Sequence, residues 1–448
     1  MNGTIAALAT PWGESAIAVV RISGGQSLAL VGDIFLKESI TPRTMYHGVY
    51  RSTSGAILDD VMFVYFCEKS SYTGEDSAEI YAHGNMVIVA KILEDLCGRG
   101  CRLADRGEFT RRAFLNKKLD LCQAEAVVDL IHASSEAALA VAQRQLSGKL
   151  SEKLHAIGDE LMTVLAILET HVDFVEEEIG GNELDGRIAE RLSAVIADID
   201  LLLDSSRYQT VLGGGLNVAI IGAPNAGKSS LLNCLLGMDR ALVSPIAGTT
   251  RDFIAERVTL GGHVINLLDT AGLRADAESE LELCGMEKSI GQIRRANAYL
   301  LVIDSNADYP VLGREIFLLP SEDNCLVLEN KSDLPNSRPC GDFLPKCEHC
   351  RISVLKEPER VKVLVSNFLA KRCFLPAEVD VVVNARHVDI LTRVKQTIIR
   401  TDQTLATIGV EFSANDVRNA LEILGGMTGR YDNESMLDRL FSTFCVGK

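Results

Sequence analysis

Aromatic residues are few in this sequence, and long hydrophobic runs are absent. Phe, Trp and Tyr make up 5% of the 448 residues, and Trp12 is the one tryptophan. The chain is nevertheless 47% apolar, so its composition indicates folded domains and excludes general disorder. No stretch of about 18 uncharged apolar residues occurs, so we expect no membrane-spanning helix. At roughly 100–200 residues per domain, the chain has room for two or three hydrophobic cores.

Positive charge is also scarce. The chain has 45 Lys and Arg residues against 61 Asp and Glu residues, a net charge of −16, which disfavours unspecific binding to polyanions. A nucleic-acid partner must therefore meet a local basic patch. The best candidate is Arg99–Lys118, with seven basic and two acidic residues, and a solvated helix face is the alternative interpretation. Between Asp159 and Asp204, thirteen acidic and two basic residues indicate a solvated helix face or turn.

Targeting signals and paired cysteine spacings are missing as well. Met1–Ala9 has no basic segment ahead of an apolar one, so we expect a cytoplasmic protein. The twelve cysteines are scattered, which is typical of free thiols in a reducing compartment. The final Cys445-Val446-Gly447-Lys448 lies outside the usual prenylation set, so no lipid anchor is expected. Cys347-Glu348-His349-Cys350 has only half of a zinc-site spacing, so we do not expect zinc.

The hydrophobic pattern divides the chain into four parts. Short apolar runs such as Ala16–Ile22 and Val61–Phe66 predict strands, whereas apolar residues three and four apart from Leu150 to Leu168 predict an amphipathic helix. Gly213-Gly214-Gly215 then introduces alternating strand and helix signals, and helical spacing returns after Pro376. We expect a multidomain α/β and α chain, with an α/β domain inserted into a bundle made from two helical segments. The predicted parts are an N-terminal α+β domain over 1–118, a helical segment over 119–210, the inserted domain over 211–374 and a second helical segment over 375–448.

One glycine-containing loop has the sequence context of a phosphate-binding loop. The apolar run Val218–Ile221 leads into Gly222-Ala223-Pro224-Asn225-Ala226-Gly227-Lys228-Ser229, which precedes a helical segment. Such a loop surrounds phosphates with backbone N–H groups, while Lys228 contacts the β- and γ-phosphates and the Ser229 hydroxyl binds Mg²⁺. The strand–loop–helix context favours this interpretation over an ordinary glycine turn.

Two further motifs follow apolar runs in the same part of the chain. Asp269-Thr270-Ala271-Gly272 follows Val264–Leu268 and offers a carboxylate to the Mg²⁺ shell and a glycine amide to a γ-phosphate. Asn330-Lys331-Ser332-Asp333 follows Cys325–Leu328, and Asp333 is able to accept both N–H groups of guanine's Watson–Crick edge. In this order the motifs resemble those of the GTPase superfamily, which implies a Ras-like domain that binds GTP.

The remaining GTPase elements are less regular. Gly248–Asp252 occupies the position of a switch segment, where the resemblance assigns Thr250 to Mg²⁺, and Ser353-Val354-Leu355 is the nearest match to the fifth motif. Leu273 stands where Ras-like enzymes carry the glutamine that orients water, so another residue must do so. The candidates are Glu278, Glu280 and Glu282.

Motifs along nearly the whole chain resemble one GTPase family, the MnmE (TrmE) family of tRNA wobble-uridine modification GTPases. The matching segments are Thr73–Asp76, His83-Gly84, Arg106–Asn116, Lys118–Ala126, Gly222–Ser229, Gly248–Asp252, Asp269–Arg274 and Phe444–Lys448. The resemblance implies a K⁺-stimulated GTP hydrolase. With the FAD- and NADH-dependent partner MnmG (GidA), it would add an aminomethyl or carboxymethylaminomethyl group at C5 of uridine 34 in certain tRNAs. The resemblance also implies a homodimer and a heterotetramer with that partner. It does not indicate which tRNAs are modified, or whether glycine or ammonium is the amino donor.

The resemblance implies specific ligands. The implied GTP-binding residues are Asn225, Ala226, Gly227, Lys228, Ser229, Ser230, Ser244, Pro245, Ile246, Ala247, Gly248, Thr249, Thr250, Asp269, Thr270, Ala271, Gly272, Asn330, Lys331, Ser332, Asp333 and Ser353. The implied Mg²⁺ ligands are Ser229 and Thr250, and those for K⁺ are Asn225, Ser244, Ile246 and Thr249. K⁺ would stabilise the developing charge that an arginine finger stabilises elsewhere.

Catalytic and folate-binding residues are implied in the same way. Glu282 aligns with the glutamate that orients water, and Glu280 remains an alternative because this chain has one more residue before the match. Cys445 is a candidate reactive thiol, whose thiolate a nearby Lys448 would favour, and simple packing is the alternative. The residues implied to bind a 5-formyltetrahydrofolate-type one-carbon carrier are Arg21, Glu79, Lys118 and Lys448, each of which could instead form an exposed ion pair.

Two other functions fit part of the sequence. A ribosome-assembly GTPase should carry an RNA-binding module such as a KH domain, whereas this chain has the folate-like N-terminal segment. A purely folate-dependent methyltransferase would explain the N-terminal third but not the phosphate-binding loop.

Overall fold

The protein is a multidomain α/β and α-helical chain with two compact units. The computed structural model describes residues 3–133, 135–173, 181–209, 215–237, 255–260, 263–269, 296–307, 324–339, 344–372, 379–405, 409–429 and 434–447. One unit consists of Met1–Val128, Gln145–Ala197 and Asp389–Lys448, and the other of Asp129–Arg144 and Asp198–Val388.

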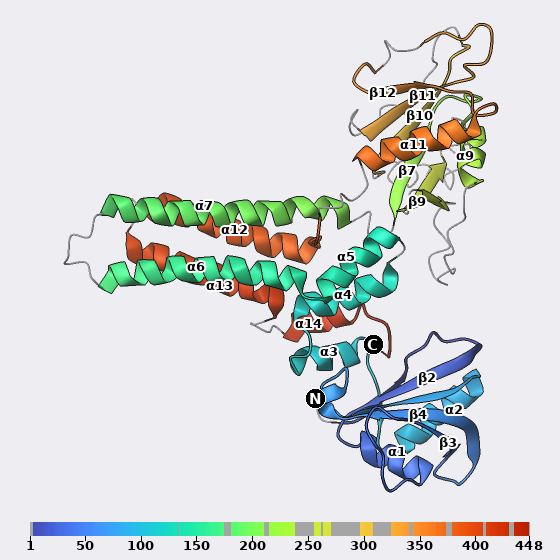
Figure 1. Cartoon of the computed structure of the whole chain (residues 1–448), viewed down its shortest axis with the longest axis vertical. Coiled ribbons are helices and arrows are strands. Elements are labelled where there is room, and N and C mark those ends of the chain that lie inside the picture. Colours follow the sequence, from blue (N-terminus) through green and yellow to red (C-terminus); the bar gives the residue numbers. More distant parts are fainter. Residues whose placement is uncertain are drawn as a thin grey trace, which may run out of the picture. The chain divides into compact units, whose positions relative to one another are not determined.

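The first unit begins with a six-stranded sheet. Its strands are β1 (Ile5–Leu8), β2 (Ser15–Ser23), β3 (Met45–Arg51), β4 (Ile57–Phe66), β5 (Ser77–Gly84) and β6 (Arg102–Leu103). The order is β3-β4-β5-β2-β1-β6, and only the β1–β6 pair is parallel. Alternate residues such as Ala18, Val20 and Ile22 are buried on one face. Helices α1 (Ser27–Phe35) and α2 (Met86–Gly98) pack their apolar side chains against this face (Figure 1).

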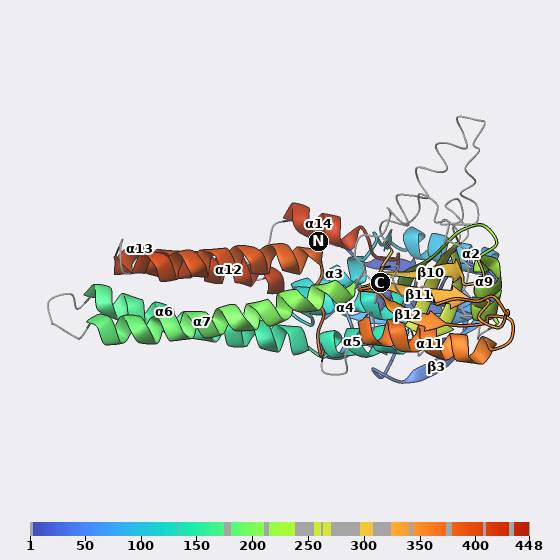
Figure 2. The same ribbon diagram turned by 90° about the horizontal axis from the view of Figure 1, so that it is seen from above.

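Helices complete the first unit. After α3 (Glu108–Leu115) and α4 (Leu121–His132), the long helices α6 (Lys149–Asp173), α7 (Gly181–Ser205), α12 (Ala385–Leu405) and α13 (Val410–Thr428) run alongside one another, and α14 (Glu434–Phe441) follows (Figures 1 and 2). The predicted amphipathic helix is confirmed, because its apolar positions from Leu150 to Leu168 are buried. Ion pairs Arg191–Glu160, Arg418–Glu169 and Arg400–Asp416 join α7 to α6, α13 to α6 and α12 to α13.

The second unit is built on a mainly parallel sheet. Its strands are β7 (Leu216–Ile221), β8 (Ala255–Leu260), β9 (His263–Asp269), β10 (Ala298–Asp304), β11 (Cys325–Asn330) and β12 (Glu348–Arg351). They form the order β12-β11-β10-β7-β9-β8, and only β8 is antiparallel to its neighbour. The predicted strands that precede the three nucleotide motifs are thus confirmed as β7, β9 and β11. Helix α5 (Glu136–Leu146) also belongs mainly to this unit.

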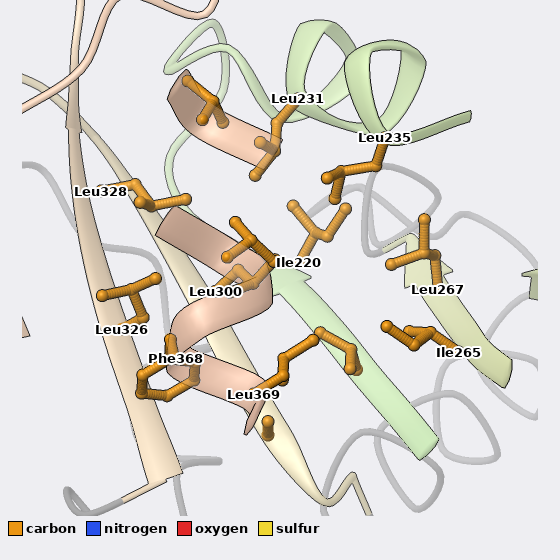
Figure 3. Close-up of a cluster of buried hydrophobic side chains, with 14 of the residues drawn as sticks. Ile220, Leu231, Leu235, Ile265, Leu267, Leu300, Leu326, Leu328, Phe368 and Leu369 are labelled. Atoms are coloured by element: carbon orange, nitrogen blue, oxygen red, sulfur yellow. The ribbon is translucent and has the colours of Figure 1, made fainter. Parts of the chain in front are cut away.

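One face of this sheet carries the main hydrophobic core of the unit. Helices α9 (Lys228–Leu236) and α11 (Pro358–Arg372) cover it, with Leu231 and Leu235 from α9 and Phe368 and Leu369 from α11 pointing toward Ile220 and its neighbours (Figure 3). Both faces of β7, β10 and β11 are buried, as expected for parallel strands. Rigid strands of this kind hold the loops at their carboxyl ends in fixed positions.

Candidate functional site

The central strand β7 ends where its two parallel neighbours, β10 and β9, lie on opposite sides. In an open parallel sheet, a reversal of strand order at one strand opens a crevice at the carboxyl ends of the strands, where ligands bind. The loop 222–227 leaves β7 at this point and leads into α9. The fold therefore places the predicted phosphate-binding loop at the position where a ligand is expected.

Close backbone contacts fix the conformation of this loop. Gly222 has φ +146°, and a Cβ atom there would lie 2.2 Å from the carbonyl oxygen of Val302. Gly227 has φ +109°, and its Cβ would lie 2.1 Å from Nδ2 of Asn330. A side chain at either position would displace neighbouring strands or the Asn330 side chain. Asn225, the predicted K⁺ ligand, is exposed in the same loop with φ +63°.

Lys228 and Ser229 occupy the first turn of α9, directly after this loop. The Nζ of Lys228 donates to the carbonyl oxygens of Gly222 and Ala223 at 2.7 and 3.0 Å, so the ammonium lies over the loop. Ser229 is exposed, and Ala226 and Ser230 flank the turn. Free N–H groups at a helix N-terminus together with a lysine ammonium favour a polyanion such as a nucleotide triphosphate.

Asn330 connects the guanine motif to the phosphate-binding loop. It is only 5% exposed at the end of β11, and its Nδ2 donates to the carbonyl oxygen of Ala226 at 2.9 Å. Its Oδ1 accepts from the N–H of Val354 at 3.1 Å. The side-chain amide of Asn330 therefore joins three predicted nucleotide-binding segments, one of them 104 residues before it and the other 24 residues after it.

Asp333 and Ser353 are brought together at the same edge. A hydrogen bond from Ser353, supported by the Lys356 ammonium 3.7 Å away, lowers the pKa of Asp333. Ser353 is itself 4% exposed. The Asp333 carboxylate is thus ionised at neutral pH and acts only as an acceptor, which is the property that recognition of guanine's two N–H groups requires.

The sequence interpretation missed Asp304 at this edge. Asp304 ends β10, and its Oδ2 lies 2.6 Å from Nζ of Lys331, the second residue of the guanine motif. Lys331 has φ +61°, a conformation unfavourable for a residue with a side chain. The ion pair therefore ties the guanine motif to the end of β10. An acidic residue directly after the apolar run 298–303 was the available signal.

Several predicted residues lie outside the described part of the chain. They are Ser244, Pro245, Ile246, Ala247, Gly248, Thr249, Thr250, Thr270, Ala271, Gly272, Leu273, Glu278, Glu280, Glu282 and Lys448. Asp269 ends β9 and is paired in register with Ile220 of β7, so its backbone lies beside the strand that carries the phosphate-binding loop. Ser332, the remaining residue of the guanine motif, donates its N–H to the carbonyl oxygen of Ile352.

The predicted folate ligands of the first unit are only partly brought together. Arg21 and Glu79 pair in register across β2 and β5, and the Nε and Nη2 of Arg21 lie 2.9 and 2.8 Å from Oε1 of Glu79. Tyr81 donates its hydroxyl to Oε2 of Glu79 at 2.7 Å. Burial, assisted by Glu79, raises the pKa of Tyr81 to about 12. Lys118 is exposed, and its Nζ donates to the carbonyl oxygen of Lys69 instead.

The predicted basic surface over Arg99–Lys118 is wrong for part of this segment. Four of its seven cations form ion pairs within the first unit. These are Arg99 with Asp33 and Asp95, Arg102 with Asp105 and Glu108, Arg111 with Asp438, and Arg112 with Glu75 and Glu108. Arg112 is 3% exposed, so it cannot meet a phosphate backbone. Arg102, Arg106, Lys117 and Lys118 are exposed, so these four cations fit either interpretation.

Cys445 and the segment Cys347–Cys350 are the residues that the sequence offered as a candidate thiol and as half of a zinc-site spacing. Cys445 is exposed. His349 uses both ring nitrogens, one 3.2 Å from Oε1 of Glu329 and the other 3.2 Å from the carbonyl oxygen of Leu344. Within the described ranges, no group of three or more His, Cys, Asp or Glu side chains is arranged to hold a metal ion.

The sheet order, the phosphate-binding loop at its switch point and the Asn330–Asp333 motif beside it define a P-loop GTPase. Among the helices of the described residues, none is long and apolar enough to cross a bilayer.

Comparison with known proteins identifies the family. Residues 4–118 match the family described as "GTP-binding protein TrmE N-terminus", and residues 121–445 match "MnmE helical domain". The tRNA modification GTPase MnmE of Opitutus terrae is 40% identical over 452 residues, covering 100% of this chain and 99% of the relative. Its namesake from Aquifex aeolicus is 38% identical over 452 residues, covering 100% of each chain. The chain belongs to the MnmE family.

Proposed function

We propose that this protein hydrolyses GTP to drive the modification of wobble uridine in tRNA. The observation that carries the proposal is the assembly of Lys228, Asn330 and Asp333 at one sheet edge, in a chain that matches tRNA modification GTPases along its full length. With an FAD-containing partner of the MnmG type, it adds an aminomethyl or carboxymethylaminomethyl group at C5 of uridine 34. It acts as a homodimer that forms a heterotetramer with this partner.

The chain's residues bind and orient the nucleotide. Backbone N–H groups of 225–230 surround the β-phosphate, Lys228 moves from the loop carbonyls to the β- and γ-phosphates, and Asp333 accepts from the guanine edge. Ser229 and Thr250 would hold Mg²⁺. The fit is supported by the exposed Ser229 hydroxyl in the first turn of α9, which is a hard oxygen donor. When bound, Mg²⁺ offsets the negative charge of the phosphates.

A monovalent cation replaces the arginine finger in this proposal. Asn225 is exposed in the phosphate-binding loop. Its side-chain oxygen would be one K⁺ ligand, together with oxygens of Ser244, Ile246 and Thr249. Glu282, or Glu280 as the alternative, orients the attacking water, because Leu273 has no polar group.

The decisive experiment compares GTP turnover in KCl and NaCl at equal ionic strength, for the wild type and for Asn225→Ala. We expect stimulation by KCl in the wild type and its loss in the variant, with GTP affinity nearly retained. Lys228→Ala serves as a control that removes nucleotide binding itself. Equal wild-type turnover in both salts would exclude the cation mechanism, and a preference for ATP over GTP would exclude the whole proposal.

A second activity concerns the first unit. Arg21, Glu79, Lys118 and Lys448 bind a 5-formyltetrahydrofolate-type carrier, supported by the half-buried Arg21–Glu79 pair on the sheet. A guanidinium suits the carboxylates of a folate, and a carboxylate suits the N–H groups of its pterin ring. Titration of 5-formyltetrahydrofolate into the wild type and Glu79→Gln, by calorimetry, tests this site. Equal affinity of the two proteins would contradict it.

A further inference from the structure

The segment that contains Cys445 lies along the N-terminal part of the first unit. Val446 forms an antiparallel bridge with Arg106, and the N–H of Gly107 donates to the carbonyl oxygen of Cys445 at 3.3 Å. Phe444 is 3% exposed within a hydrophobic cluster that includes Phe114. Residues 444–447 are thus attached by backbone pairing on one side and by an apolar side chain on the other. We refer to residues 444–447 as the tail segment.

Gly447 permits a contact that no other residue type allows. Its φ is +89°, and a Cβ atom there would lie 2.2 Å from the carbonyl oxygen of Leu8 and 2.9 Å from Cα of Ala9. Both obstacles are backbone atoms at the end of β1, where a rotamer change gives no relief. A side chain at position 447 would therefore force the tail segment away from β1.

The carbonyl group of Gly447 in turn contacts Arg21. The Nη1 of Arg21 donates to it at 3.2 Å, while Nε and Nη2 face Glu79. The same guanidinium lies 5.9 and 5.8 Å from the ring centroids of Tyr72 and Phe109. Because Nε and Nη2 face Glu79, the contact between Nη1 and the tail carbonyl ties the Arg21 side chain to residues 444–447.

We propose that Gly447 is a positioning residue for the site at Arg21 and Glu79. By holding its carbonyl oxygen against Nη1, it fixes the orientation of Arg21 and links that site to the strand pairing that holds Cys445. The inference rests on the proposed binding of a reduced folate at this pair. It adds a residue whose effect is transmitted through Arg21 and not through contact with the ligand.

The test measures tail attachment and ligand affinity in the same full-length variants. In Gly447→Ala, we expect faster backbone hydrogen exchange in residues 445–447 and at Gly107. We also expect affinity for 5-formyltetrahydrofolate to fall about tenfold, the effect of losing one hydrogen bond that orients a charged group. Gly447→Asn should behave like Gly447→Ala, because asparagine tolerates positive φ but still carries a Cβ. Val446→Ala is the matched control, since this neighbouring side chain is 51% exposed.

A double-mutant comparison separates positioning from general damage. In an Arg21→Gln background, Gly447→Ala should change ligand affinity less than twofold, and GTP turnover should be unchanged by Gly447→Ala alone. Wild-type affinity in Gly447→Ala, or an equal loss with and without Arg21, would overturn the inference even if the wild type binds the folate. A wild type that does not bind 5-formyltetrahydrofolate would overturn the folate part of the proposed function and the inference with it.

Discussion

The sequence motifs of the two sheet-containing domains differ in their exposure. We call the part of the first unit built on β1–β6 the N-terminal domain, and the part of the second unit built on β7–β12 the nucleotide domain. In the nucleotide domain, motif residues such as Asn225 and Ser229 stand exposed on loops at strand ends, where a ligand can reach them. In the N-terminal domain, Glu108, Thr110 and Arg112 of an equally distinctive motif are 2%, 0% and 3% exposed. The side chains of the first motif are accessible to a ligand, whereas those of the second are buried and pair with one another and with neighbouring segments. We call Glu108, Arg112 and their partners Glu75 and Arg102 the framework.

The difference shows that a charged motif is not evidence of a binding surface. Arg112 donates to Glu75 at 2.8 Å, to Glu108 at 2.9 Å and to the carbonyl oxygen of Gly3 at 3.0 Å, joining α3 to the loop before β5 and to the chain ahead of β1. Arg102 reaches Glu108 from β6. Buried charges of this kind persist only when they are paired.

The largest expected effect tests this framework directly. Arg112→Ala leaves Glu108 buried with one cation fewer and should destabilise the N-terminal domain by about 3–5 kcal/mol. Hydrogen exchange of the slowest amides in β1 and β2 should accelerate roughly 100- to 4,000-fold as a result. GTP affinity should not change, because the nucleotide domain is a separate compact unit.

Arg418→Ala is the control for the loss of an arginine. Its partner is Glu169, and the two side chains are 53% and 47% exposed, so the expected cost is below about 1 kcal/mol. Similar exchange rates in Arg112→Ala and Arg418→Ala would refute the distinction between framework and surface.

The nucleotide domain was predictable because its signals are local. An apolar run, a glycine loop and a helix start are contiguous around Lys228, and the strand ends before Asp269 and Asn330 are read from short runs. Parallel strands then bring their carboxyl ends to one edge without further information. The sequence did not predict that the side-chain amide of Asn330 connects three segments. This connection depends on how loops that are distant in sequence pack together.

The N-terminal domain was less predictable because its contacts are distant in sequence. Four of the seven cations of 99–118 are paired with acidic residues, such as Glu75 and Asp438, that the local sequence does not reveal. The register of β2 against β5, which pairs Arg21 with Glu79, likewise has no local signal. Composition fixes how many charges there are, whereas the fold decides which of them meet.

A second prediction tests whether the Asp333 carboxylate of the nucleotide domain contacts the guanine base. Asp333→Asn should lower affinity for GTP roughly 10- to 100-fold, because the amide presents a donor to a guanine donor. Xanthosine triphosphate, which has a carbonyl oxygen in place of the guanine amino group, should bind the variant better than GTP does. Nucleotide titration with both ligands checks this exchange. Retained GTP preference in Asp333→Asn would show that Asp333 does not contact the base.

A smaller effect is expected at Asp304, where the site depends on a supporting ion pair. Asp304→Ala removes the partner of Lys331, whose side chain is 33% exposed, so nucleotide affinity should fall about two- to fivefold. The change should weaken at high salt, because the wild-type pair is itself screened there. The matched control is Glu357→Ala, which removes the exposed partner of Arg360 on the same domain. A loss as large as that of Asp333→Asn would place Asp304 in direct contact with the ligand.

The smallest effect is a pH dependence confined to the framework. Burial alone would raise the pKa of Glu108, but hydrogen bonds from Arg102, the Asp105 N–H and Arg112 outweigh it, so the folded-state pKa is lowered. A lowered carboxylate pKa stabilises the fold above the unfolded value of about 4.3, and this contribution is lost as pH falls from there through the folded pKa. Backbone amide hydrogen exchange in α3 should therefore accelerate below about pH 4, after correction for the pH dependence of the intrinsic exchange rate. Glu108→Gln should flatten this dependence while lowering stability at neutral pH. If exchange in α3 slowed on acidification, the direction of the coupling would be reversed, and the ion pairs of Glu108 would not be what holds this helix.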